Sequence, residues 1–152
     1  MAINSVTGGD KFKRALEDIA KRMGKAPVLK IGFFETEQYP DGEYVAQVAA
    51  ENEFGSTTNP PRPFMRQTFS RNKDTWPSMA TKGMKATNFD VDKTLELLGQ
   101  EITGEVKEAI AEWGNPFPHN SQATIDKKGF DDPLVDTGRM LQSVTWVLED
   151  AK

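Results

Sequence analysis

The stretch Asp90–Trp113, with the sequence DVDKTLELLGQEITGEVKEAIAEW, decides the fold of this chain. Its apolar residues recur at intervals of three or four, which is the spacing of one face of an amphipathic helix. Gly99 and Gly104 each weaken a helix by about 1 kcal/mol relative to alanine, so we expect a close neighbour or a bend at these two positions. The apolar positions are Val91, Leu95, Leu98, Ile102, Val106, Ala109, Ile110 and Trp113.

Two stretches on either side of this helix have the period of β-strands. In PVLKIGFFET (27–36) both alternating faces are largely apolar, and this pattern is typical of a central strand. Residues Ser143–Leu148 alternate in the same way. We expect Ile31, Phe33 and Trp146 to be buried in one sheet against the long helix. The chain therefore predicts an α+β fold, with a small, mostly antiparallel sheet packed by the long helix of the C-terminal half and by shorter helices.

Shorter helices are expected along the rest of the chain. Asp10–Gly24 has one apolar and one charged face, which predicts a helix whose apolar face packs on another surface. A short helix is expected over Glu43–Phe54, and another begins with Pro63 at its first position, where proline is tolerated. Between residues 71 and 86, Pro77 interrupts an irregular pattern, which favours two short helical pieces.

Length and composition limit the classes of protein to consider. The 152 residues correspond to a single domain over residues 1–152, with a long loop arm at about 114–135. The absence of cysteine excludes disulfides and thiolate chemistry. With 19 basic and 23 acidic residues, the chain lacks the basic excess of proteins that coat nucleic acid. No apolar run is long enough to span a membrane and no secretory signal is visible, so we expect a soluble intracellular protein.

Catalytic motifs are sparse. His119 is the single histidine, and it lies in a proline-rich loop without the strained turn that carries a serine nucleophile, which favours a surface position over a hydrolytic triad. Asp131, Asp132 and Asp136 form a tight acidic cluster whose spacing does not match a calcium-binding loop. Either these carboxylates hold a divalent metal, or they shape a turn in which Asp136 caps the segment starting at Thr137. The second interpretation is favoured, and we expect neither an enzyme nor a metal or cofactor site.

The segment Ser56–Pro63 (STTNPPRP) excludes regular structure because proline cannot supply ladder hydrogen bonds. Arg62 and Arg66 flank Pro63 and Phe64. Arginine and aromatic residues dominate interface hot spots, so this group is a candidate interface anchor that a stiff segment presents at small entropic cost. The alternative is that Arg62 is merely solvated and Phe64 belongs to the core.

Two segments together resemble a known family. The first, VAAENEFGSTTNPPRPFMRQTF, spans Val48–Phe69, and the second, FDDPLVDTGRMLQSVTWVL, spans Phe130–Leu148. They resemble the Asn-Glu-Phe-Gly, Pro-Pro-Arg-Pro-Phe and Asp-Thr-Gly-x-x-x-x-Ser signatures of neck, or tail-completion, proteins of long-tailed bacteriophages, a group that includes the minor tail protein Z type. The resemblance covers most of Val28–Leu148. In the best-known version the Thr-Gly segment comes first, whereas here it comes last.

The resemblance implies a structural subunit that assembles, usually as a six-fold ring, where the head connector meets the tail. Its partners would be further copies of the chain, the head connector or adaptor, and the tail terminator or tail tube proteins. It would belong to the virion, after assembly in the host cytoplasm. With a net charge of −4 per subunit, a negative lumen would let DNA pass without sequence-specific binding, and no membrane would be involved. The interface residues that we expect are Arg62, Pro63, Phe64, Arg66, Asp136, Thr137 and Gly138.

Two alternatives remain open. The chain could be a tail terminator or a head-closure protein of a phage or prophage, which would also form ring assemblies. It could instead be a metal-dependent hydrolase that uses Asp131, Asp132 and Asp136, which would show an activity dependent on divalent ions.

Overall fold

The long helix predicted from the sequence is the axis of the structure. The computed structural model describes residues 9–24, 26–34, 36–112 and 116–151. Helix α5 (Val91–Ala111) begins after Asp90, whose carboxylate accepts a hydrogen bond from the backbone N–H of Lys93 at 3.1 Å. This contact caps the helix as a side-chain oxygen at the N-terminus should. Trp113, the last apolar position of the predicted helix, lies outside the described residues.

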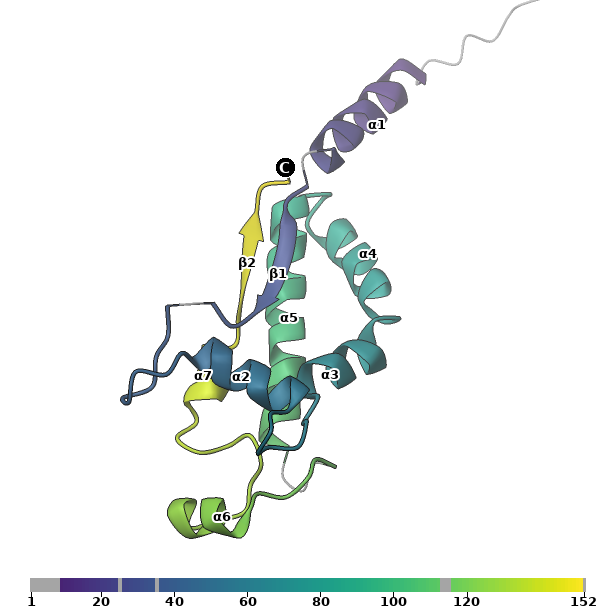
Figure 1. The fold of residues 1–152 in the computed structure, drawn as a ribbon. Coiled ribbons are helices and arrows are strands. Elements are labelled where there is room, and N and C mark those ends of the chain that lie inside the picture. Colours follow the sequence, from purple (N-terminus) through teal and green to yellow (C-terminus); the bar gives the residue numbers. More distant parts are fainter. Residues whose placement is uncertain (1–8, 25, 35, 113–115, 152) are drawn as a thin grey trace, which may run out of the picture.

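A two-stranded antiparallel sheet packs against α5 (Figure 1). Strand β1 (Val28–Gly32) pairs with β2 (Thr145–Glu149) in a register that places Ile31 opposite Trp146. The prediction of a central first strand is wrong, because β2 is the only strand that pairs with β1 in the described part of the chain. Away from α5, Lys30 and Glu149 form an ion pair with both side chains half exposed, so solvent takes the place of a second layer.

Sheet and helix come into close contact at one glycine. A Cβ atom on Gly99 would lie 2.8 Å from Cγ and Cδ2 of Trp146 and 3.0 Å from Cδ1 of Leu29. The expected close neighbour is therefore confirmed at Gly99. At Gly104 nothing lies within 4 Å of the same ideal position, so the expectation of a close neighbour is wrong there.

The buried core lies around the C-terminal half of α5, where side chains of α2 (Val45–Phe54), α3 (Phe64–Asn72) and α7 (Arg139–Ser143) meet. The prediction that Ile31, Phe33 and Trp146 are buried in the sheet is wrong, because all three are only half-buried. Phe33 reaches the edge of the core through an edge-to-face contact with Phe64, at 6.1 Å between ring centroids. Two strands cover too little of α5 to enclose a core, and helices do so instead. The core residues are Val45, Ala49, Phe64, Val106, Ile110, Phe117, Met140 and Val144.

The short helices form where they were predicted, with shifted ends. Helix α3 begins at Phe64, directly after Pro63, and extends to Asn72. Helix α4 (Trp76–Ala86) is continuous because Pro77 lies in its first turn, so the predicted interruption falls before the helix rather than within it. None of the helices in the described ranges combines the length and the apolar character that crossing a bilayer requires.

Helix α1 (Gly9–Met23) forms as predicted, and the surface expected to cover its apolar face is not found in the described part of the chain. None of its residues is buried. It lies beyond the start of β1, at the opposite end of the molecule from α6 (Gln122–Lys128) (Figure 1). The amphipathic pattern is therefore real, but within the described chain the apolar face of α1 stays open to solvent.

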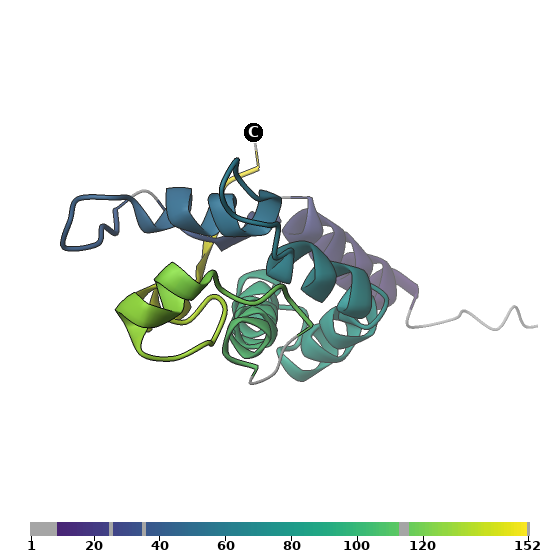
Figure 2. The same ribbon diagram turned by 60° about the horizontal axis from the view of Figure 1, so that its bottom comes forward.

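The segment expected to be a loop arm over residues 114–135 contains α6. The Oγ of Ser121 accepts a hydrogen bond from the backbone N–H of Thr124 at 3.3 Å and caps this helix, and Gly129 ends it. Figure 2 shows α6 near the end of α5 and close to the loops that follow it. The prediction of an arm without regular structure is therefore wrong for the described part of this segment.

Candidate interface around the proline-rich segment

The proline-rich segment begins with a turn that requires glycine. Helix α2 ends at Phe54, and Gly55 adopts a φ of 80°. A Cβ atom on Gly55 would lie 3.0 Å from the backbone nitrogen of Pro61 and 3.1 Å from the carbonyl oxygen of Asn59. Positive φ and close backbone approach both favour glycine. This geometry explains why a glycine follows Glu53-Phe54 in the first signature segment.

Arg62 lies inside the subunit. Its side chain is buried, with 5 % of the residue exposed, and its guanidinium donates to four acceptors. Nε bonds to the carbonyl oxygen of Pro118 at 2.9 Å, and Nη1 bonds to Oδ1 of Asn52 at 3.2 Å. Nη2 reaches the carbonyl of His119 at 3.2 Å and Oδ1 of Asn120 at 3.4 Å. The planar fork of arginine suits such a set of converging acceptors.

The prediction that the segment presents Arg62 to a neighbouring subunit is therefore wrong. The alternative of a solvated Arg62 is wrong as well. Burial lowers the pKa of Arg62, and the charge of Asp131 partly opposes this change. The physical reason for the burial is the chain that precedes α6, because its backbone carbonyls have no strand or helix partners and take the guanidinium donors instead.

Glu53 stabilises the start of α3. The residue is 5 % exposed, and its carboxylate accepts hydrogen bonds from the backbone N–H groups of Met65 at 2.8 Å and Arg66 at 3.1 Å. Pro63, at the N-cap, makes no side-chain hydrogen bond to the helix. A carboxylate from α2 thus satisfies the free N–H groups and complements the positive end of the helix dipole. Sequence reasoning missed this role, for which the one signal was a helix start lacking a Ser, Thr, Asp or Asn cap.

The exposed arginine–aromatic pair of the segment is Arg66 with Phe54. Phe64 is 1 % exposed and belongs to the core, as the alternative interpretation held. Arg66 donates from Nε to Oε1 of Glu53 at 2.8 Å, and its guanidinium carbon lies 5.0 Å from the centroid of the Phe54 ring. The Phe54 residue is 67 % exposed. Of the expected interface residues around Pro63, Arg66 is thus the one at the surface with a neighbouring aromatic side chain.

This pair stands at the rim of an apolar groove. The groove has a volume of about 360 Å³ and lies between the end of β1 and helices α2 and α3. Small side chains of α2 form one wall, which would let another backbone approach closely. The residues that line the groove are Ile31, Gly32, Phe33, Ala46, Ala49, Ala50, Glu53, Phe54, Phe64, Met65 and Arg66.

The turn Asp136–Gly138 lies next to the Arg62 network. Asp136, Thr137 and Gly138 line a polar hollow of about 280 Å³, together with Asn52 and Asn120, the two amides that bind Arg62. The two predicted groups of interface residues are therefore neighbours in space, although some 70 positions separate them in the chain.

Thr137, rather than Asp136, supplies the oxygen at the start of α7. The backbone N–H of Arg139 donates to Oγ1 of Thr137 at 3.4 Å, and Gly138 adopts a φ of 76°. The prediction that Asp136 caps this segment is not what the structure shows. Asp136 is exposed, and its charge adds to burial in raising the pKa of Tyr39 on the same hollow.

Lys128 binds the backbone of the loop that follows α6. Its ammonium donates to the carbonyl oxygen of Asp132 at 2.8 Å and to that of Val135, and it lies 4.8 Å from the centroid of the Phe130 ring. Burial lowers the pKa of Lys128, and the charge of Asp136 opposes this change. The start of the second signature segment is thereby held against α6.

The three aspartates of the acidic cluster differ in their contacts and burial. Asp131 accepts hydrogen bonds from Nδ1 of His119 at 2.7 Å and from the backbone N–H of Asn120 at 3.0 Å, and the second of these is the main reason why its pKa is lowered. Burial raises the pKa of Asp132. Among the described residues, no group of three or more acidic or histidine side chains is placed to hold a metal ion. His119 stands in solvent, which confirms its expected surface position.

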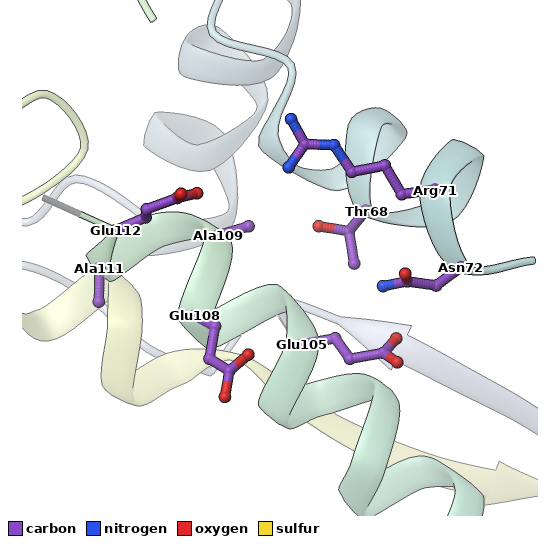
Figure 3. A pocket seen from close by; sticks show the side chains of 8 residues that line it. All are labelled: Thr68, Arg71, Asn72, Glu105, Glu108, Ala109, Ala111 and Glu112. Atoms are coloured by element: carbon purple, nitrogen blue, oxygen red, sulfur yellow. The ribbon is translucent and has the colours of Figure 1, made fainter. Parts of the chain in front are cut away.

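A further hollow of about 570 Å³ lies between α3 and the end of α5. Figure 3 shows the glutamates of α5 on one side and the polar side chains of α3 on the other. Glu105 accepts a hydrogen bond from Nε1 of Trp76 at 2.9 Å, so part of this acidic lining serves helix packing. The lining residues are Thr68, Arg71, Asn72, Glu105, Glu108, Ala109, Ala111 and Glu112.

Comparisons of the chain with protein-family models, with curated proteins and with solved structures found no match.

Proposed function

We propose that this chain is a structural subunit of the neck of a long-tailed bacteriophage, a tail-completion protein that forms a ring with copies of itself at the head–tail junction. The location in the neck derives from the resemblance of residues 48–69 and 130–148 to the signatures of that family. One structural observation carries the assembly part: the subunit leaves large apolar side chains exposed, and the most exposed of them lie on α1 and beside the apolar groove. Phe12 and Leu16 on α1 are 67 % and 50 % exposed, and Phe54 stands at the rim of the apolar groove. Contiguous exposed apolar surface marks sites where other molecules bind.

The roles of the signature residues support a structural protein. Phe64 from the first segment and Met140 and Val144 from the second belong to the same buried cluster. Arg62 binds the backbone between the two segments, and Gly55 permits the turn that places it there. These residues hold the subunit together and leave its outer surfaces to partners. That division suits a ring component, whose activity is to bind its neighbours.

The partners that follow from this proposal are a second copy on each side, the head connector or adaptor, and the tail terminator or tail tube. A net charge of −4 per subunit would repel the DNA phosphates and let the genome pass.

The decisive experiment is complementation in a phage or prophage that encodes this chain, with the reading frame interrupted by an early stop codon. We expect heads and tails to accumulate unjoined, or tails to remain unfinished, and infectivity to return when the wild-type chain is supplied from a plasmid. Electron microscopy of complemented particles, with a label on the chain, should show the label at the head–tail junction.

A frame carrying a silent change at the same codon serves as the matched control. A label along the tail tube, or a normal yield of infectious particles without the chain, would overturn the proposal. A label at the first tail disc would favour the tail-terminator alternative, and one on the connector of isolated heads would favour head closure. An activity that requires divalent ions would support the hydrolase alternative.

A further inference from the structure

The apolar face of α1 has no cover in the described chain. Phe12, Leu16 and Met23 lie on one side of the helix, and all three are at least half exposed. The helix is 15 residues long, about 22 Å, and its apolar stripe from Phe12 to Met23 extends over about 16 Å. Burial of such a stripe against another apolar surface is favourable, in proportion to the apolar area removed from water.

The apolar groove beside Phe54 has the chemistry to receive such a stripe. Ala46 and Ala50 lie one turn apart on α2, so a second helix can pack closely against them, as ridges pack into grooves. Phe54 and Arg66 stand at one end as exposed anchors, and arginine and aromatic residues carry much of the energy in known interfaces.

Charge complements the fit between the two surfaces. Helix α1 contains five basic and three acidic residues, a net charge of +2. The groove itself is balanced in charge, because its Glu53 is paired with its Arg66. The segment from Ile31 to Pro61 around it contains six acidic residues and no basic one, and the acidic excess includes the exposed Glu43 before α2 and Glu51 on α2. Opposite potentials of this kind steer two surfaces together and set their orientation. A second copy of the chain brings its own basic α1 to this acidic region.

The two surfaces lie toward opposite ends of β1. Helix α1 precedes Val28, whereas the groove is lined by Ile31, Gly32 and Phe33 at the far end of the strand, and Figure 1 shows α1 and α2 at a distance from each other. We propose that α1 of one copy docks in the groove of the next copy, apolar face inward. Complementary patches at opposite ends give head-to-tail association, which closes into a ring when the rotation between copies permits. The inference deepens the proposed function and rests on it for the biological setting, but its contact can be tested in solution.

Disulfide trapping tests the contact directly, because the chain contains no cysteine of its own. One protein carries Leu16→Cys on α1, and a second, differently tagged protein carries Ala50→Cys in the groove. Mixing the two under mild oxidation should give a cross-linked dimer that contains both tags. Leu97→Cys is the matched control in place of Ala50→Cys, since Leu97 is 52 % exposed but lies on α5 outside the groove. We expect little cross-linking between Leu16→Cys and Leu97→Cys.

A chain that carries both Leu16→Cys and Ala50→Cys identifies the copy that supplies the helix. Denaturing electrophoresis should show disulfide-linked dimers and larger species. If the product is instead a monomer with an internal disulfide, α1 folds back on its own groove and the inference is overturned. Equal cross-linking of the Leu97→Cys control would overturn it as well.

Sedimentation measures the energy of the contact. The variant Phe12→Ser/Leu16→Ser should self-associate about ten- to a hundredfold more weakly than the wild type, because two apolar side chains no longer gain from burial. Its unfolding midpoint should not change, since neither residue is buried in the subunit. Association of the wild type should also weaken as salt screens the basic and acidic surfaces.

The outcomes separate the inference from the proposed function. Wild-type protein that stays monomeric at the highest concentration it tolerates would overturn the α1 contact. So would rings that still form with Phe12→Ser/Leu16→Ser. In either case a label at the head–tail junction would leave the proposed function standing. If α1 cross-links between copies but the label is absent from the head–tail junction, the α1 contact stands and the proposed function is overturned.

Discussion

The contact at Gly99 allows a sharp test of the fold, because Gly104 in the same helix serves as its control. Both glycines lie in α5, so replacing either by alanine removes the same unfavourable helix propensity, about 1 kcal/mol. At Gly104 nothing lies within 4 Å of the new methyl group. The Gly104→Ala variant should therefore be up to about 1 kcal/mol more stable than the wild type.

At Gly99 the same methyl group would lie 2.8 Å from Cγ and Cδ2 of Trp146, against the 3.5–4.0 Å of an ordinary carbon–carbon contact. Cγ is close to the backbone of β2, so the indole cannot move aside without shifting the strand. Overpacking of this kind costs about 1–3 kcal/mol. Gly99→Ala should consequently be less stable than Gly104→Ala by about that amount.

Urea unfolding followed by far-ultraviolet circular dichroism measures the difference. A second variant isolates the cause: in a Trp146→Val background the ring is gone, and Gly99→Ala should regain the favourable helix propensity. The two changes should thus show a coupling free energy of about 1–3 kcal/mol. Equal midpoints for Gly99→Ala and Gly104→Ala, or additive effects in the double variant, would refute the reasoning that α5 and β2 touch at this point.

Three further predictions follow from the network around the proline-rich segment. Arg62→Ala removes four side-chain hydrogen bonds from a buried site and should lower the free energy of unfolding by about 2–4 kcal/mol. Arg62→Lys should recover only part of this loss, because an ammonium group cannot match the planar fork of arginine donors. An unchanged urea midpoint for Arg62→Ala would contradict the network. Glu53→Gln keeps the size of the side chain but removes its charge from the start of α3, and calorimetry should show a loss of about 1–2 kcal/mol; wild-type stability would show that the charge has no part in the cap. The pKa of Asp131 is lowered in the folded protein, mainly by the hydrogen bond from the backbone N–H of Asn120. The ionised carboxylate therefore stabilises the fold at any pH above the ordinary aspartate pKa of about 3.9. This stabilisation is lost as the pH falls through the lower pKa of the folded state. The urea midpoint of the wild type should therefore fall more steeply with acid than that of Asp131→Asn, and parallel pH profiles would count against this role.

The sequence predicted which segments form helices and strands more successfully than where those segments and their side chains lie in the fold. Helix α5 and both strands could be recognised because hydrophobic period is a local property, readable in a window of ten to twenty residues. The glycine at the end of α2 could be recognised for the same reason, since the end of a helix depends on a few adjacent residues.

At the candidate interface, local sequence patterns did not predict which side chains are buried. Sequence reasoning identified Arg62 and Phe64 as a special pair, and the structure shows both to be special by being buried. Whether an arginine faces solvent or the interior depends on the acceptors around it. For Arg62 these include the carbonyls of Pro118 and His119, more than fifty positions away, and no local pattern marks a backbone carbonyl as free. The surface pair, Phe54 with Arg66, could only be recognised once Glu53 had been seen to turn inward.

The sequence by itself determined the α+β class, the order α1, β1, α2, α3, α5 and β2, and the amphipathic character of α1 and α5, because each follows from the spacing of side chains along a short stretch of backbone. Only the tertiary structure decided that β1 has a single partner, that the core surrounds the far half of α5, that Arg62 is buried and that the apolar face of α1 is open. Those outcomes depend on which distant segments compete for the same surface, and that competition is settled by packing and by hydrogen bonding of buried polar groups across the whole chain.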